Sequence, residues 1–460
     1  MTLACVARDA SRSLIPMLRL ASSAILVLAL LSGAAIGQVL RSTTTWGGTG
    51  SDIAHGVAVA GDGSSYVVGL SDSFTVDEFN QNRAAISLVK FAADGSLAWQ
   101  RLWTGTTFHG GLTGLGGPAV ALSPGQDAVY VSGLTSTNGN DAVLLKFATD
   151  GTLLWQRTWG GSSAEEANGV ATDSEGSVYV AGTTTSFGPS SAGVFVLKFS
   201  AAGTLVWQKI YDGASGFAVG VAPDGNVYAA GSKSRDPFGG NFDMLVLKMT
   251  SAGALLWDVT YSAGVQADPR GGMTVASDGS PIIAGAVQAE KGGIVGIAAL
   301  VVKLAANNGA LVFDGEWGGR EGSEALGVAV GANGSVYVAG QVSQGDRTEG
   351  AFVFSVDTRG RGISAATWGG TEFESGHGVG LQADGTVVLA ATTSAGPPYS
   401  LLEASRRVSA VRGDVAAAGG ALADPAGAVA DPNATVITPN GSTTFAGGFD
   451  TALVRFTPQP

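Results

Sequence analysis

One unit of about 54 residues recurs along almost the whole chain, and this repetition restricts the fold more than any other feature of the sequence. The clearest copy begins at Gly160-Gly161, continues as NGVATDSEGSVYVAG over 168–182 and ends as VFVLKFSAAGTLVWQKIY over 194–211. Asp-Gly and Asn-Gly turns divide the copies, and such two-residue turns are the strongest short-range signal of a β-hairpin. Each copy therefore predicts four short strands, which we call a, b, c and d in chain order.

Aromatic residues end strand d in the successive copies. All nine tryptophans fall in these strands, and pairs such as Trp99/Trp103 are four residues apart. Residues i and i+4 of a strand face the same side of a sheet, so each copy offers an aromatic pair to one neighbour. A sugar-binding platform is the alternative interpretation, but packing between copies accounts for every pair. The terminal aromatic residues are Trp46, Trp103, Trp159, Tyr211, Tyr261, Trp317 and Trp368.

Four-stranded repeats that pack only on one another predict an all-β fold, a single β-propeller. The 423 residues from Gln38 onward equal about 7.9 units of the mean interval, so we expect eight four-stranded blades. The segment 392–433 departs from the repeat. It is either a degenerate blade, with 399–413 as its c–d pair, or a long insertion over 395–433 in a ring of seven blades.

The two ends of the chain complement each other. The segment 39–46 matches a lone strand d that ends at Trp46, and 434–456 fits strands a, b and c without a strand d. We expect these ends to pair and complete one blade. Such closure removes the exposed strand edges that an open array would leave.

These residues resemble the bacterial SBBP-type β-propeller repeat, whose pattern runs Trp-Gly-Gly, an acid, GVAVD-x-x-GNVYV-x-G and then VKF-x-x-x-G-x-L-x-W. The a–b hairpins also resemble the NHL repeat. The resemblance covers nearly all of 45–391 and, more weakly, 434–456. It implies a propeller of a secreted or cell-surface protein, and it implies no particular activity.

The N-terminus predicts a signal peptide over 1–37 and a propeller over 38–460. Three arginines precede an apolar run at 24–31, and Ala35-Ile36-Gly37 supplies the small residues that precede a cleavage site. A membrane anchor is the alternative, but the run is short for a span. Removal of 1–37 takes away Cys5, the single cysteine, and leaves a net charge of −14. We expect a secreted, periplasmic or cell-surface monomer that inserts into no membrane, and the acidic charge disfavours nucleic acid as a partner.

Strand direction divides the loops between two faces, and the variable d–a and b–c loops share one of them. We expect any ligand on this d–a/b–c face, because function usually resides in variable loops on a rigid scaffold. An acid recurs there six or seven residues after the terminal aromatic. It predicts either a ring of carboxylates that attracts a cation or, the interpretation we favour, an acceptor for backbone N–H groups of the nearby turn. The acids are Asp52, Glu165, Glu166, Asp268, Glu324 and Glu374.

All three histidines, His55, His109 and His377, also fall in these loops or directly before strand a. With Asp52 and Glu374 they are candidates for a metal or acid–base site. They come from different blades, however, and lack the close spacing of known metal-binding motifs. We therefore expect no cofactor and no strong dependence on a metal.

The function that the sequence favours is a non-catalytic interaction or scaffold module that binds a protein or glycan through the d–a/b–c face. The alternative is an extracellular enzyme, such as a hydrolase, a lyase or a quinoprotein-like enzyme, with its site in the central channel. The chain contains no G-x-S-x-G elbow, no P-loop and no cysteine pair.

Overall fold

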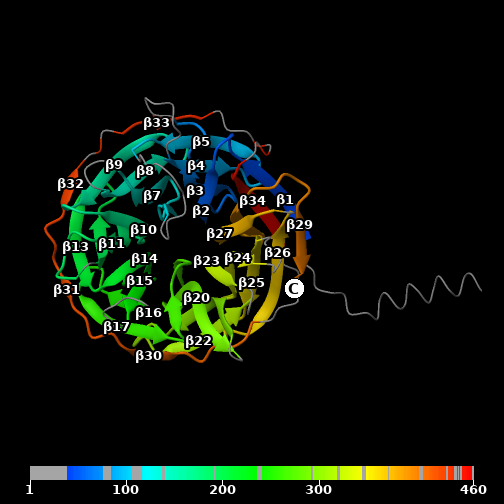
Figure 1. Ribbon diagram of the computed structural model, residues 1–460. Coiled ribbons are helices and arrows are strands. Elements are labelled where there is room, and N and C mark those ends of the chain that lie inside the picture. Colours follow the sequence, from blue (N-terminus) through cyan, green and yellow to red (C-terminus); the bar gives the residue numbers. More distant parts are fainter. Residues whose placement is uncertain are drawn as a thin grey trace, which may run out of the picture.

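In the computed structural model, the described strands surround a central axis and form seven sheets, the blades (Figure 1). No helix in this described part is long and apolar enough to cross a membrane. The predicted signal peptide and His109 lie outside the described residues. The structure describes residues 39–75, 84–105, 117–136, 140–190, 192–235, 241–291, 294–318, 322–343, 349–370, 372–403, 408–430, 432, 434–439, 443, 445 and 448–457.

Four blades follow the predicted order of strands a to d from the axis outward, and each consists of one continuous stretch of chain. Blade 1 contains β2 (Asp52–Val59), β3 (Ser65–Ser71), β4 (Ala85–Phe91) and β5 (Leu97–Trp103). Blade 2 contains β6 (Ala119–Leu122), β7 (Ala128–Leu134), β8 (Ala142–Ala148) and β9 (Leu153–Gly160). Blade 3 contains β10 (Glu165–Thr172), β11 (Val178–Thr184), β12 (Gly193–Phe199) and β13 (Leu205–Asp212). Blade 4 contains β14 (Ala214–Val221), β15 (Val227–Ser234), β16 (Phe242–Met249) and β17 (Leu255–Ser262).

The next two blades keep this order, but strand a of blade 5 is interrupted. Blade 5 contains β18 (Gln266–Asp268) and β19 (Met273–Val275), which both pair with β20 (Pro281–Lys291), followed by β21 (Ile294–Leu304) and β22 (Leu311–Trp317). Blade 6 contains β23 (Ser323–Val330), β24 (Val336–Ser343), β25 (Glu349–Val356) and β26 (Gly362–Gly369).

Blade 7 joins the two ends of the chain, which confirms the predicted closure. Its strands are β27 (Glu374–Leu381), β28 (Val387–Thr393), β34 (Asp450–Thr457) and the N-terminal β1 (Val39–Trp46). β1 pairs antiparallel with β34 from Val39↔Thr457 to Trp46↔Thr451. Strands a and b of this blade are β27 and β28, and not the predicted segment before β34.

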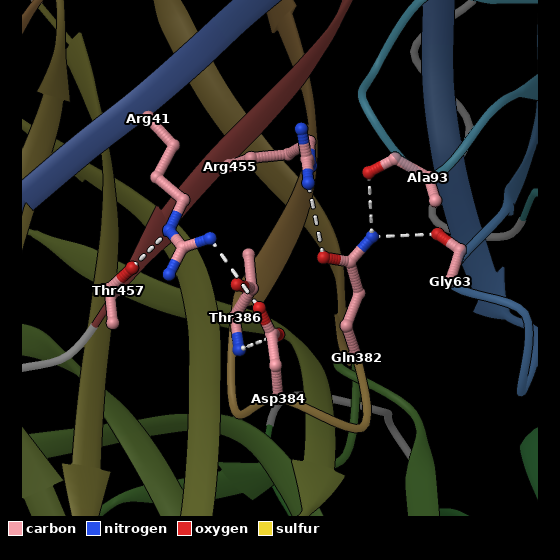
Figure 2. Close-up of polar contacts among 8 residues, drawn as sticks. All are labelled: Arg41, Gly63, Ala93, Gln382, Asp384, Thr386, Arg455 and Thr457. Carbon is pink, nitrogen blue, oxygen red and sulfur yellow. Dashed lines mark hydrogen bonds and ion pairs between the residues drawn. The ribbon is translucent and has the colours of Figure 1, made fainter.

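Polar contacts join the strands and turns of the closing blade to one another and join this blade to blade 1 (Figure 2). Arg455 donates to Gln382 Oε1 over 3.2 Å, and Gln382 Nε2 donates to the carbonyls of Gly63 and Ala93 over 2.6 and 3.2 Å. Arg41 of β1 donates to the hydroxyl of Thr457. Trp46 is fully buried and donates from its indole to Gln100 of blade 1. β1 is therefore held by β34 within its own sheet and by the contact of Trp46 with Gln100 of blade 1.

The expected eight blades of four strands are wrong, because the segment before β34 forms no blade. Instead, the described residues of 398–439, which we call the belt, run around the rim of the propeller in the reverse direction (Figure 1, orange to red). The belt adds an outer strand to most blades: β29 (Ser400–Glu403) on β26, β30 (Asp414–Ala417) on β17, β31 (Leu422–Ala423) on β13, β32 (Ala428–Ala430) on β9 and β33 (Val436–Ile437) on β5. Blade 5 meets it through a bridge between Glu316 and Ser409.

The belt has its own seven-residue repeat, RGDVAAA, GGALADP, AGAVADP and NATVITP over 412–439, so one unit spans one blade. The second position is a glycine in three units because an aromatic ring of strand d lies beneath it. A Cβ there would lie 2.1–2.4 Å from ring atoms, for Gly413 on Tyr261, Gly420 on Tyr211 and Gly427 on Trp159. The recurring prolines lack an N–H donor and suit an outermost strand. These residues explain why the segment forms a rim and not an eighth blade.

One polar position of strand d binds the belt to two blades. Gln156 accepts the indole N–H of Trp103 in the preceding blade over 2.8 Å and donates to the belt carbonyl of Pro432 over 2.6 Å. Gln100 and Gln208 repeat this arrangement with Pro439 and Pro425. The repeated contacts give the belt a structural role.

Four lysines of strand c, in blades 1 to 4, also connect the blades. Each places its ammonium group 5.0–5.2 Å from a tyrosine ring centroid and donates to a carbonyl in the c–d turn of the next blade. The pairs are Lys90 on Tyr66, Lys146 on Tyr130, Lys198 on Tyr179 and Lys248 on Tyr228.

Candidate functional site: the central cavity

A cavity of about 600 Å³ lies on the propeller axis. Its walls come from strand a of all seven blades, and most of its lining is apolar, with Val57, Val170 and Val328 as examples. The lining also includes Phe373, which precedes β27, and Phe449, which precedes β34, but no residue of the a–b turns. The cavity therefore lies toward the d–a/b–c face, where the sequence places the variable loops.

A β-bulge interrupts strand a at an equivalent position in five blades. In blade 1 the register shifts between Ala54 and Gly56, which leaves His55 as the extra residue. Bulges redirect a side chain and are frequent beside functional sites. The bulge residues of these five blades, His55, Asn168, Phe217, Leu326 and His377, all line the cavity.

The other two blades contribute Pro118, directly before β6, and Arg270, between β18 and β19, to the same cavity wall. We call these seven residues the bulge ring. Its members differ chemically from blade to blade, whereas the glycine or alanine and the valine that follow them recur in most copies. A position that varies within an otherwise repeated strand has no uniform packing role.

Arg270 is the cationic member of the bulge ring, and two carboxylates hold it. Its Nε donates to Asp268 over 2.8 Å, and its Nη1 donates to Glu324 over 3.2 Å. Burial disfavours the charged guanidinium, but the hydrogen bond and charge of Asp268 and the charge of Glu324 raise the Arg270 pKa. Gln341 extends the network from Glu324 to the buried hydroxyl of Ser375. This side of the cavity is polar, and its one guanidinium and two carboxylates give it a formal charge of −1.

His55 and His377 lie side by side in the wall, with their ring centroids 5.7 Å apart. They are 322 positions apart in the sequence, but blades 1 and 7 become neighbours when the ring closes. Burial lowers the pKa of His55 to about 4, against a small opposing effect of the Ile53 backbone. Burial and the neighbouring His55 lower the pKa of His377 to about 3. Both imidazoles are therefore neutral at neutral pH.

The recurring acids lie outside the cavity wall, except Glu324, and are engaged in contacts. Asp52 and Glu165 are buried and accept the N–H groups of Gly48 and Gly161, each over 2.8 Å. Glu374 accepts the N–H of Gly370, and burial raises its pKa. These are the turn contacts of the structural interpretation. Asp268 and Glu324 differ because they bind Arg270, and Glu166 is exposed.

Sequence reasoning therefore named His55, His377 and Glu324 among the cavity residues, and it missed most of the bulge ring. Asn168, Phe217, Arg270 and Leu326 were overlooked because they share no residue type. A comparison of the copies position by position would have found three of them, since Asn168 and Leu326 stand directly before the recurring Gly-Val of strand a and Phe217 stands before its Ala-Val variant.

The described residues contain no group of three or more His, Cys, Asp or Glu side chains arranged to hold a metal ion. His109, the third candidate histidine, is outside those residues. What the described cavity provides is a partly apolar chamber with a neutral imidazole pair on one side and an Arg270-centred network on another. Such a chamber is typical of sites for small or extended ligands.

A family model described as a beta-propeller repeat, SBBP, matches residues 159–188, so this part of the chain carries an SBBP repeat. No curated protein sequence matches the chain. Among solved structures, the polysaccharide lyase Uly1 is 13% identical, with 90% of each chain covered and a TM-score of 0.45. The Dos1 propeller is 10% identical over 81% of this chain and 95% of its own, with a TM-score of 0.46.

A quinohemoprotein alcohol dehydrogenase from Comamonas testosteroni is 12% identical to the chain, with 91% of this chain and 76% of the enzyme covered and a TM-score of 0.43. Similarities this low do not indicate an activity for the chain.

Proposed function

We propose that the protein is a secreted, non-catalytic interaction module that binds a protein or glycan through its d–a/b–c face, with the central cavity at the middle of the binding surface. The observation that supports this most is the bulge ring. Seven wall positions, one from each blade, carry six different residue types, although the strands around them repeat. Selection for packing alone favours one residue type at equivalent positions.

The electrostatics of the described wall also favour binding over catalysis. The Arg270 guanidinium is paired with two carboxylates, and the buried Asp52 and Glu165 are bonded to turn N–H groups. A general acid or base has to reach the substrate directly. Apolar side chains such as Phe217 and Leu326 instead offer contact area, which suits a ligand that is held and not transformed.

One observation favours the alternative, an enzyme acting in the channel. His55 and His377 are neutral and line the cavity, and a neutral imidazole is a competent base. The two functions differ in what removal of these imidazoles does. An enzyme loses turnover, whereas a binding module loses at most affinity.

A pair of matched variants tests the binding proposal. Phe217→Arg introduces a charge into the cavity wall, and Ala252→Arg introduces the same charge in the exposed c–d turn of the same blade, on the opposite face. Each purified variant and the parent are applied to a glycan array and to biotinylated surface proteins of the producing cells. We expect Phe217→Arg to abolish the binding that the parent shows and Ala252→Arg to retain it. Equal loss in both variants, or loss in Ala252→Arg alone, contradicts the proposal.

A further inference from the structure

The paired histidines carry an inference that goes beyond the proposed interaction function and does not depend on it. Histidine is the only residue type that appears twice in the bulge ring of the described structure, and the two histidines lie in the adjacent blades 1 and 7. At the other bulge positions the wall uses apolar side chains or polar ones with partners, such as Asn168, which donates to the Gly216 carbonyl over 2.9 Å.

His55 has an unsatisfied nitrogen. Within the described residues its Nδ1 is buried and has no hydrogen-bond partner, and the Ile53 backbone supplies the polar interaction that this ring has. Buried polar groups are nearly always satisfied, and an exception calls for an explanation. Gly117 of blade 2 fixes the His55 ring from one side, because a Cβ there would lie 1.8 Å from Cδ2. The ring is thus held in place with its Nδ1 unsatisfied.

The spacing of the two rings suits a shared metal ion. With metal–nitrogen distances of about 2.0–2.1 Å and a roughly tetrahedral angle, two imidazoles on one ion have centroids about 5–6 Å apart. The observed separation is 5.7 Å.

We propose that His55 and His377 together bind one divalent transition-metal ion of the Zn²⁺ or Cu²⁺ class in the central cavity. Imidazole is a preferred ligand of these ions. The two histidines supply two coordination positions, and water or a ligand in the cavity supplies the others. The proposal departs from the sequence-based expectation of no strong dependence on a metal, which rested on the lack of close spacing and on the histidines belonging to different blades. Ring closure removes that objection.

The test is metal binding by the untagged full-length secreted protein, stripped with chelator and titrated with ZnCl₂ and with CuCl₂ at neutral pH in a calorimeter. We expect one equivalent to bind, and His55→Ala or His377→Ala to weaken binding at least about tenfold. Asn168→Ala, a matched change in the same ring, leaves affinity unchanged. His55→Gln and His377→Gln serve where an alanine variant melts below the parent, since glutamine fills more of the space of the imidazole and is a poor ligand.

Electron paramagnetic resonance of the Cu²⁺ complex gives a second readout. Couplings from two imidazole nitrogens are expected in the parent and from one in each single variant. No stoichiometric binding of either ion by the parent, or binding that both histidine variants retain, overturns the proposal. Neither result affects the proposed partner binding, which is measured without added metal and on Phe217→Arg.

Discussion

Both the rim and the central cavity of this propeller have one recurring position per blade, but the residue at that position repeats along the rim and varies around the cavity. Along the belt, the same contacts recur: glycine over an aromatic ring at Gly413, Gly420 and Gly427, and a proline carbonyl on a glutamine of strand d. Around the cavity, the side chain changes at every blade except where the two histidines meet. Repeated chemistry indicates architecture, and chemistry that differs at equivalent positions indicates a function specific to that position.

The closing blade is where this architecture is most vulnerable. Deleting Val39–Trp46 while keeping the predicted signal peptide removes the strand that pairs with β34 and a fully buried tryptophan. Burial of a large aromatic and strand pairing each contribute on the order of 1–3 kcal/mol, so we expect a loss of several kcal/mol and a poor soluble yield. Thermal unfolding measures the effect. Deletion of 458–460 is the control, and a 39–46 deletion that melts like the parent contradicts closure by β1.

The next largest loss of stability is expected for a substitution of Asp314 at the rim. This buried carboxylate accepts the N–H groups of Val411, Arg412 and Gly413 and the hydroxyl of Tyr261. Asp314→Ala leaves these donors unpaired, which we expect to lower the free energy of unfolding by about 2–4 kcal/mol.

Asp424→Ala is the matched control for Asp314→Ala, because Asp424 is an exposed belt carboxylate that pairs with Lys209. We expect this change to cost less than about 1 kcal/mol in urea unfolding. Equal effects of the two variants show that the belt is not held through Asp314.

The histidine pair predicts a pH effect that the rim lacks. Because burial lowers both pKa values below 6.5, the unfolded chain binds more protons than the folded one between about pH 6.5 and 4. The free energy of unfolding therefore falls as the pH drops through this window, by about 1.4 kcal/mol per pH unit for each histidine. Asp52 and Glu374, whose pKa values are raised, act in the opposite direction. The measurement is thus the difference in the free energy of unfolding between the parent and the double variant His55→Gln/His377→Gln. This difference is expected to vanish above about pH 7. A difference that is independent of pH contradicts the lowered pKa values.

The smallest expected effect on stability lies in the bulge ring itself. Leu326 lines the open cavity and is half-buried, so Leu326→Ala should cost at most about 1 kcal/mol. Leu300 is fully buried between blades, and Leu300→Ala should cost about 2–5 kcal/mol. Calorimetric melting of the two variants compares the same substitution in both environments. A Leu326→Ala loss as large as that of Leu300→Ala would show that the ring is part of the packed core.

The repeats predict the propeller, its strand order and its closure because turn glycines and terminal aromatics are local signals. The blade count was wrong because Val436 and Ile437, with the Asn-Gly after them, imitate an a–b hairpin, although they pair with β5 at the rim. The seven-residue period that marks the belt is visible in the sequence. The meeting of His55 and His377 is not, because it depends on which two blades the closed ring makes neighbours.

The belt is the element that separates seven blades from eight, and an engineered disulfide tests it most directly. Val259 of β17 and Ala417 of β30 are directly opposite each other, a spacing that a disulfide can bridge. Because Cys5 is the single natural cysteine, Val259→Cys/Ala417→Cys should cross-link almost completely on export, as mass spectrometry of a digest can show. The control Val259→Cys/Ala423→Cys, whose second position pairs with Ile210 in the next blade, should stay reduced. If the first pair stays reduced, or if both pairs cross-link equally, the belt does not follow the rim as described.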